Sequence, residues 1–212
     1  MTEFIYLHGF ASGPNSNKAI AFKKRFEELK VPICVPDLQE NDFENLTLSR
    51  QIKLVQSIID DKKGKEFGLI GSSMGGYLAS LTAQTRDTVK AIYLMAPGFN
   101  FLERWQKKLK NSQVEGPLIP VFHYRYNKEV FLNTNLFIDA ELWQSFSLEK
   151  NIPTKIVHGL HDDTVNIQES RDFVSSHPWC HLTELDSDHG LLSSIDWIIE
   201  DCIKFFGKQS LI

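Results

Sequence analysis

Short apolar runs alternate along the chain with segments in which apolar residues recur at helical spacing. Continuous apolar runs of three to six residues suit strands that are buried on both faces, as in a parallel sheet covered by helices. The pattern therefore predicts an α/β fold with a mostly parallel sheet of about six strands and helices on both faces. The predicted strands are residues 4–7, 33–35, 67–70, 91–95, 155–157 and 180–185.

Helices are predicted between most of these strands, because apolar residues there lie three or four positions apart. Four of them cover residues 19–29, 48–59, 78–82 and 191–203. Another helix is expected after Asn166, since Asn166 and Glu169 have the spacing of a capping box. Sites in such folds form beyond the carboxyl ends of the strands, so polar residues in those loops are the first candidates for function.

The alternation stops between residues 98 and 150, where no strand and helix unit is recognisable and aromatic residues are frequent. A long insertion inside a compact domain is often a lid or a binding element. We therefore expect a single domain over residues 1–212 with a cap-like insertion at about 98–150, and we expect Trp105, Tyr124 and Trp143 to contact substrate. The alternative is that the aromatic residues only give this segment a small core of its own.

The sequence Gly71-Ser72-Ser73-Met74-Gly75 follows a predicted strand and precedes a predicted helix. This is the context of a G-x-S-x-G nucleophile elbow, and only Ser73 fits its central position. The flanking glycines are needed because side chains two positions on either side of a sharply turned serine would collide. The sequence predicts Ser73 as a nucleophile; the alternative is a glycine loop that binds phosphate at a helix N-terminus.

A serine nucleophile needs a base to accept its proton and an acid to orient that base. Asp162 lies in the loop after the predicted strand 155–157, and His189 lies in the loop after the last strand. The chain order Ser, Asp, His is that of α/β-hydrolases, so Asp162 and His189 are the predicted acid and base. Of the other histidines, His8 is expected to order a backbone loop, and His123 could touch substrate but more simply packs.

Backbone N–H groups are expected to stabilise the oxyanion that forms when the serine attacks. One donor should be Met74, the residue after the nucleophile. The other is predicted to be Phe10, in the glycine-containing loop that follows the first strand.

Composition narrows the functional classes. The chain has 212 residues, of which 42% are hydrophobic, enough for one core. Its formal net charge is -4 and its basic residues are scattered, which argues against a nucleic-acid partner. No stretch approaches the roughly 20 apolar residues of a membrane span, and the N-terminus lacks the features of a signal peptide, so we expect a cytoplasmic protein. The three cysteines are an odd number without CxxC spacing, and we expect them to be reduced.

Several blocks of the sequence resemble the α/β-hydrolase superfamily, and more closely its YqiA/YcfP-type esterases. The resemblance covers nearly the whole chain and implies hydrolysis of a small-molecule carboxylic ester or acyl thioester, with no cofactor and no metal. Asn166 departs from the pattern, because many hydrolases have proline there. The blocks are YLHGFASGPNS (6–16), VPDL (35–38), GSSMGGY (71–77), LMAPGF (94–99), HGLHDDTVNIQESRDF (158–173) and LDSDHGL (185–191).

Other functions remain open at this point. The same three residues could serve another acyl transfer or a C–C hydrolase, because fold does not decide among them. His158, His161, Asp162 and Asp163 are residue types that bind zinc or iron. A binding protein that retains the fold without activity is a third possibility, and the oligomeric state is not predicted.

Overall fold

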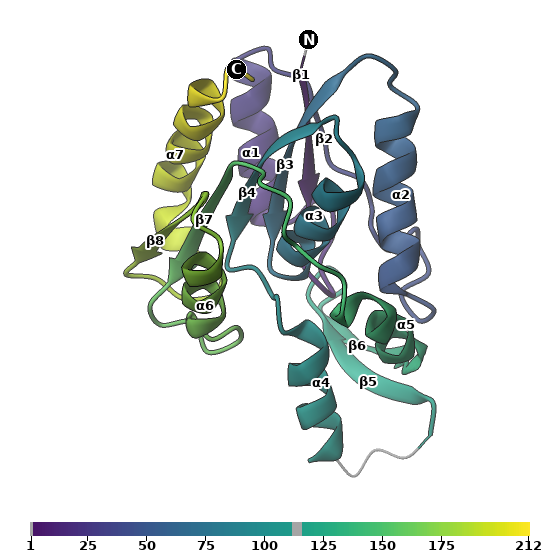
Figure 1. Cartoon of the computed structure of the whole chain (residues 1–212). Helices are drawn as coiled ribbons and strands as arrows, with labels where there is room; N and C mark the ends of the chain where they lie inside the picture. Colours follow the sequence, from purple (N-terminus) through teal and green to yellow (C-terminus); the bar gives the residue numbers. More distant parts are fainter. Residues whose placement is uncertain (1, 112–115) are drawn as a thin grey trace.

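The computed structural model describes residues 2–111 and 116–212, and a six-stranded parallel sheet lies at its centre (Figure 1). The strand order is β2-β1-β3-β4-β7-β8. All six predicted strands are present and parallel, which confirms the sheet read from the sequence. Their bounds are β1 (Thr2–Leu7), β2 (Ile33–Cys34), β3 (Glu66–Ser72), β4 (Val89–Met95), β7 (Thr154–Gly159) and β8 (Cys180–Leu185).

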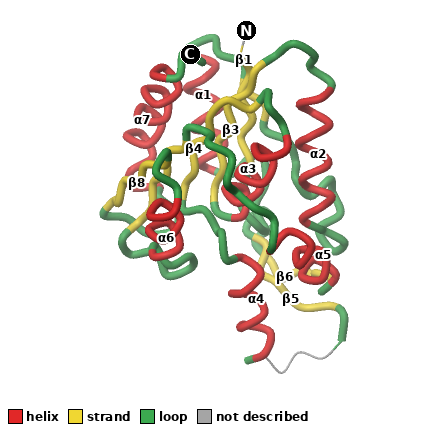
Figure 2. The backbone as a smooth tube through the Cα atoms, viewed as in Figure 1, coloured by secondary structure: helices red, strands yellow, loops and turns green. Residues whose placement is uncertain are grey.

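Helices cover both faces of the sheet (Figure 2). Helices α1 (Asn17–Glu28) and α7 (Ile195–Lys208) pack on one face, where Phe22 and Phe206 join a buried cluster with Phe4 of β1. Helices α2 (Leu48–Asp60), α3 (Met74–Thr85) and α6 (Gln168–Ser176) lie on the other. Among the described helices, none is long and apolar enough to cross a bilayer.

The order of the strands brings the functional loops together. The chain passes from β1 to β2 at the edge of the sheet and then crosses to β3 on the other side of β1, so the segments after β1 and β3 start side by side. Leu7 at the end of β1 pairs with Gly71 of β3. In open α/β sheets such a switch point opens a crevice where ligands bind. The loops after β7 and β8 leave the sheet at the same edge.

The segment predicted as an insertion forms α4 (Phe101–Lys110), the antiparallel hairpin of β5 (Leu118–His123) and β6 (Lys128–Asn133), and α5 (Asn135–Gln144). Figure 1 shows these elements together beyond the carboxyl ends of the sheet strands. Residues 112–115 of the segment lie outside the described residues. One face of the hairpin packs inward through Ile119, Val121 and Leu132, whereas Phe122 and Phe131 on its outer face are exposed.

The predicted capping box at α6 is wrong in one half. The Asn166 side chain accepts a hydrogen bond from the Gln168 N–H (2.8 Å), as a helix start requires. Glu169 does not return to Asn166; its buried carboxylate accepts from the Asn100 N–H (2.8 Å) and from the Arg104 guanidinium. A cation from the insertion therefore holds this carboxylate, and α4 is tied to the start of α6.

Candidate active site

Ser73 occupies a strained turn between β3 and α3. Its backbone has φ 56° and ψ −120°, a conformation that non-glycine residues rarely adopt and that costs about 1–3 kcal/mol. Four hydrogen bonds hold it there: its N–H donates to the Met95 carbonyl, and its own carbonyl accepts from the N–H groups of Gly76, Tyr77 and Gly98. The strain presents the serine side chain at the sheet edge, half-buried and open to the cleft.

The glycines on either side of Ser73 are sterically required. A Cβ atom at Gly75 would collide with the carbonyl oxygens of Leu7 and His8, and one at Gly71 would collide with the backbone of Gly75 and Gly76. The turn can therefore approach β1 closely only without side chains at these positions. A phosphate-binding glycine loop, the alternative hypothesis, would not require these close backbone contacts on both sides of Ser73.

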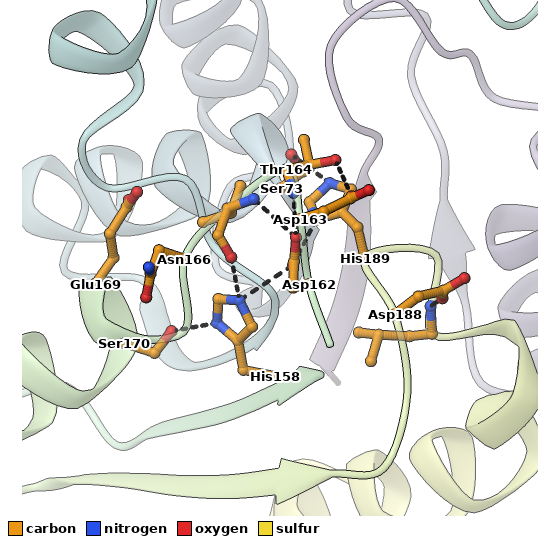
Figure 3. A network of polar contacts seen from close by, with 12 residues as sticks. Ser73, His158, Asp162, Asp163, Thr164, Asn166, Glu169, Ser170, Asp188 and His189 are labelled. Atoms are coloured by element: carbon orange, nitrogen blue, oxygen red, sulfur yellow. Dashed lines mark hydrogen bonds and ion pairs between the residues drawn. The ribbon is translucent and has the colours of Figure 1, made fainter. Parts of the chain in front are cut away.

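Three side chains from distant parts of the sequence form one hydrogen-bonded chain (Figure 3). The Ser73 Oγ lies 3.2 Å from Nε2 of His189, and Nδ1 of His189 lies 2.7 Å from Oδ2 of Asp162. The structure thus brings together the three residues that the sequence assigned to nucleophile, base and acid. The Asp162 side chain is fully buried, while that of His189 is 23% exposed.

The Asp162 carboxylate has a hydrogen-bond donor on every side. Oδ1 accepts from the N–H groups of Thr164 (2.9 Å) and Val165 (2.7 Å), and Oδ2 accepts from both His189 and Nε2 of His158 (3.1 Å). Burial alone would raise the pKa of Asp162, but the hydrogen bonds from His158, His189 and the Val165 N–H outweigh it and hold the pKa well below its usual range. The residue is therefore a fixed negative charge next to His189.

The other acidic candidates point elsewhere. The Asp163 carboxylate bonds the hydroxyl of Thr164 (3.1 Å), and Oδ1 of Asp188 accepts from the Leu191 N–H (3.0 Å). Asp186 is exposed and pairs with His161 (2.7 Å). In Figure 3 Asp162 lies between His158 and His189, whereas Asp188 lies apart from this network.

His158 contacts Asp162, which the sequence did not predict, since the pattern indicates only a turn position ahead of the acid. The fully buried ring has Nε2 2.9 Å from the Val165 carbonyl as well as near Asp162, and Nδ1 2.7 Å from the Ser170 hydroxyl. Since Nε2 faces two acceptors, it carries the proton, and Ser170 donates to Nδ1. A signal was available: His158 ends a buried strand four residues before the acid.

The loop after β1 supplies the second group of candidates. No hydrogen bond in the described part of the chain uses the N–H groups of Phe10 and Met74, and both residues line the cleft beside Ser73. Below them, buried His8 accepts from the Leu38 N–H at Nε2 (3.1 Å) and bonds the Gly9 carbonyl through Nδ1 (3.0 Å). Burial lowers the pKa of His8, so the ring stays neutral and ties this loop to the segment after β2.

The insertion holds the same loop from the other side. The Tyr124 N–H donates to the carbonyl of Ala11 (2.9 Å), a residue at φ 52°. Gln39 bridges the loop and the hairpin, because its amide donates to the Ser12 carbonyl (2.6 Å) and its Oε1 lies 3.0 Å from Nε2 of His123. His123 is fully buried and stacks on Tyr126, which agrees with a packing role and not with contact to substrate.

A cleft of about 950 Å³ opens over Ser73 and His189. The sheet-edge loops form one wall, and α4 with the β5–β6 hairpin forms the other. Trp105 and Tyr124 line the cleft, as expected for substrate contacts. The structure places Trp143 differently: it is absent from the lining, its indole N–H donates to Ser49 (2.8 Å), and its carbonyl accepts from the Tyr77 hydroxyl (3.2 Å). Trp143 anchors α5 to the domain.

The residues that could form a metal site or supply a cysteine nucleophile do not gather at one place. His158 and Asp162 bond each other, whereas His161 turns outward to Asp186, and within residues 2–111 and 116–212 no three His, Cys, Asp or Glu side chains are grouped to hold a metal. Cys180 and Cys202 are buried free thiols, and burial raises the pKa of Cys180 to about 11. Neither of them lines the cleft.

Two curated sequences are similar to this chain. One, named "Putative esterase/lipase 2", from Mycoplasma pneumoniae, is 36% identical over 101 residues, which cover 44% of this chain and 37% of that protein. The human mitochondrial palmitoyl-protein thioesterase ABHD10 is 26% identical over 208 residues, or 92% of this chain and 64% of that protein. The chain thus spans about one third to two thirds of the length of these relatives.

Solved structures share the fold. Est1E from Butyrivibrio proteoclasticus, in a structure with bound ferulic acid, superposes with a TM-score of 0.84 at 20% identity, covering 100% of this chain and 90% of that one. Mouse ABHD10, titled an α/β-hydrolase domain-containing protein, gives a TM-score of 0.79 at 21% identity over 98% of this chain and 90% of its own. These likenesses confirm the predicted α/β-hydrolase fold. A family model described as "Uncharacterised protein family (UPF0227)" matches residues 3–207, and the chain therefore belongs to this YqiA-type family.

Proposed function

We propose that this protein is a serine hydrolase that cleaves a carboxylic ester or an acyl thioester through an acyl-enzyme on Ser73. The observation that carries the proposal is the hydrogen-bonded chain from Ser73 through His189 to Asp162, at the floor of a cleft open to solvent. The names of the two curated relatives, an esterase/lipase and a thioesterase, support the same class of reaction.

In the first half of the reaction the Ser73 oxygen attacks the acyl carbon while Nε2 of His189 takes the hydroxyl proton. The carbonyl oxygen becomes an oxyanion that accepts hydrogen bonds from the N–H groups of Phe10 and Met74. When the tetrahedral intermediate collapses, the bond to the alcohol or thiol breaks, and the proton on Nε2 goes to that leaving group. The acyl group is then bound to Ser73.

In the second half a water molecule attacks the acyl carbon, and Nε2 of His189 accepts its proton. The same two backbone donors stabilise the second oxyanion. Collapse releases the carboxylic acid and returns the proton to Ser73. Asp162 holds the Nδ1 proton of His189 throughout, and His158 acts as a positioning residue that keeps Oδ2 of Asp162 aimed at the imidazole.

The substrate's acyl or leaving group extends along the wall formed by the insertion. Phe10, Phe101 and Trp105 form an aromatic cluster, with ring centroids 5.4 to 6.3 Å apart, on the side of the cleft next to Ser73. Tyr124 stands at the rim, 73% exposed. We assign a substrate-binding role to Trp105 and Tyr124, and a cap role to the segment 98–150.

The neighbouring serines provide a matched test. Ser72 is buried and ends β3, whereas Ser73 faces the cleft. With 4-nitrophenyl butyrate as substrate, Ser73→Ala is expected to retain only the residual acceleration of about 10³- to 10⁴-fold over water that donors and binding provide. Ser72→Ala keeps most of the activity. If Ser72→Ala is the inactive variant, or if both variants remain active, with both folded by circular dichroism, the proposal is refuted.

A further inference from the structure

Lys18 lies in the first turn of α1 and lines the cleft next to Ser73 and His189. Its side chain is half-buried, yet it forms no hydrogen bond or ion pair with any residue that the structure describes. Asp162 and Asp188 attract the ammonium group from beyond ion-pair distance. Burial outweighs this attraction and lowers the pKa of Lys18 to about 8, so the chain keeps a poorly solvated cation in its cleft.

Neither carboxylate near Lys18 needs it as a structural partner. All the accepting positions that Asp162 uses are filled by two histidines and two backbone N–H groups. Asp188 accepts from the Leu191 N–H, and Asp163, which also lines the cleft, bonds Thr164. The ammonium group of Lys18 is therefore available to a bound molecule.

Tyr6 gives an independent indication of a ligand. Its side chain is fully buried and lines the same cleft. Within residues 2–111 and 116–212 its hydroxyl makes no hydrogen bond of ordinary geometry, although the Ser72 side chain lies close enough to act on its pKa. Buried polar groups are rarely left in this state, because an unmade hydrogen bond costs about 1–3 kcal/mol. Burial raises the pKa of Tyr6, although Ser72 nearby offsets part of the effect, so the hydroxyl remains a donor at neutral pH.

The packing of α1 places the two groups on the same side of the sheet. The Tyr6 ring lies against Phe22, with centroids 5.4 Å apart. Phe22 follows Lys18 by four residues, and side chains at this spacing share one face of a helix. The start of α1 adds the positive end of the helix dipole, with Ser16 also lining the cleft.

We propose that Lys18 and Tyr6 form an anion-binding subsite beside Ser73, and that the preferred substrates are esters or thioesters with a carboxylate or phosphate close to the bond that is cleaved. This proposal rests on the hydrolase function proposed above and adds a substrate class to it. The anion binds on the α1 side of the cleft, away from Asp163, and receives one hydrogen bond from the ammonium and one from the phenol.

Paired esters of similar shape and different charge test this subsite. On the acyl side, 4-nitrophenyl hemiglutarate is compared with neutral 4-nitrophenyl pentanoate. On the leaving-group side, 4-acetoxybenzoate and 4-acetoxyphenyl phosphate are compared with neutral phenyl acetate. Comparing the acyl-side esters with the leaving-group-side esters shows in which part of the substrate the anion lies. Comparing 4-acetoxybenzoate with 4-acetoxyphenyl phosphate shows whether a carboxylate or a phosphate is preferred.

The variants are Lys18→Met and Tyr6→Phe, with Lys24→Met as the matched control, because Lys24 is exposed on the same helix. Lys18→Met is expected to lower kcat/KM for at least one anionic ester by about 10- to 100-fold, the range of a lost charge-assisted hydrogen bond, and to leave neutral esters within about threefold. Tyr6→Phe should shift the same ester by a smaller factor, and Lys24→Met should shift none. Lys18→Gln serves as a second variant if Lys18→Met folds poorly.

Two results would overturn the subsite. In one, Lys18→Met lowers kcat/KM for neutral and anionic esters alike, which would make Lys18 a part of the general electrostatics around His189. In the other, no anionic ester responds to Lys18→Met or Lys18→Gln. Neither result touches the hydrolase proposal, which fails separately if Ser73→Ala still hydrolyses the neutral esters.

Discussion

The two walls of the cleft are fixed in different ways. At the sheet edge, the reacting groups are held by a strained backbone at Ser73 and by an aspartate whose oxygens meet four donors. The insertion is held by aromatic packing and by a few polar ties at its margins, such as that of Glu169 to Arg104. On the side of the insertion that faces the cleft, the Tyr124 ring is exposed.

The two walls are expected to affect catalysis in different ways, one through the rate of reaction and the other through substrate preference. Where side chains are joined in one hydrogen-bond network, as Ser73, His189 and Asp162 are, a single substitution disturbs the whole network, and the effect on rate is large for any substrate. Where a wall is apolar and contacts only part of a substrate, a substitution changes the relative rates of substrates. The network at the sheet edge is therefore expected to control turnover, and the insertion to control the preference for acyl chain length.

The largest effect is expected at Asp162. Asp162→Asn keeps the shape of the side chain but removes the charge and misorients the His189 tautomer, and the equivalent change in a serine protease costs about 10⁴-fold in kcat. Asp163→Asn and Asp188→Asn, the matched controls, should stay within about tenfold. Steady-state kinetics on one short ester measure all three. If Asp163→Asn shows the largest loss while folded, the acid has been assigned to the wrong residue.

A smaller effect is expected where the two walls meet. Gln39→Leu removes the bridge between the Ser12 carbonyl and His123, so the loop that carries Phe10 loses one restraint. We expect kcat for 4-nitrophenyl acetate, which is too short to reach most of the insertion, to fall about 3- to 10-fold with little change in KM. Gln51→Leu is the control, because the Gln51 side chain is also buried but, among the described residues, it donates to the Leu38 carbonyl alone. Equal losses in the two variants would mean that the bridge has no specific effect on this loop.

Within the insertion, two half-buried tryptophans differ in position. Trp105→Ala opens the cleft and is expected to change the ratio of kcat/KM for octanoate and butyrate esters by about 3- to 30-fold. Trp143→Ala removes the bond to Ser49 and should lower the melting temperature while leaving that ratio unchanged. Measured ratios that move with Trp143 and not with Trp105 would contradict the assignment of the cleft wall.

The smallest effect concerns pH. The preference for the anionic ester of a pair requires the charged form of Lys18, whose pKa is about 8, so the preference is present below pH 8 and declines as pH rises through that value. The ratio of kcat/KM for the two esters cancels the titration of groups that both esters need. Asp162 is ionised throughout this range, and Tyr6, with its raised pKa, stays protonated. A ratio that stays constant from pH 6 to pH 10 would contradict the role of the ammonium.

The sheet and the three residues that we propose for catalysis could be predicted from the sequence because the information is local. Apolar runs mark strands, and the glycines around Ser73 mark a crowded turn. Asp162 and His189 each follow a predicted strand, which places both at the carboxyl ends of a parallel sheet. The proposed oxyanion donors, the N–H groups of Phe10 and Met74, were predicted from the turns after the first and third strands.

Contacts between distant segments could not be predicted. The spacing of Asn166 and Glu169 indicated a capping box, but a cation on α4 captures the Glu169 carboxylate instead. Trp143 and Trp105 have similar aromatic surroundings in the sequence, and only the packing of α5 turns the first away from the cleft. Lys18 belongs to no recognisable sequence motif. It becomes a candidate binding residue only because the fold places it in the cleft without a partner among the described residues.

Covalent labelling tests the central claim most directly. A fluorophosphonate reacts with an activated serine, and intact mass with peptide mapping shows how many molecules bind and where. One adduct per chain is expected on Ser73, retained in Ser72→Ala and lost in Ser73→Ala. An adduct that persists in folded Ser73→Ala, or a folded wild-type protein that takes no label, would contradict it.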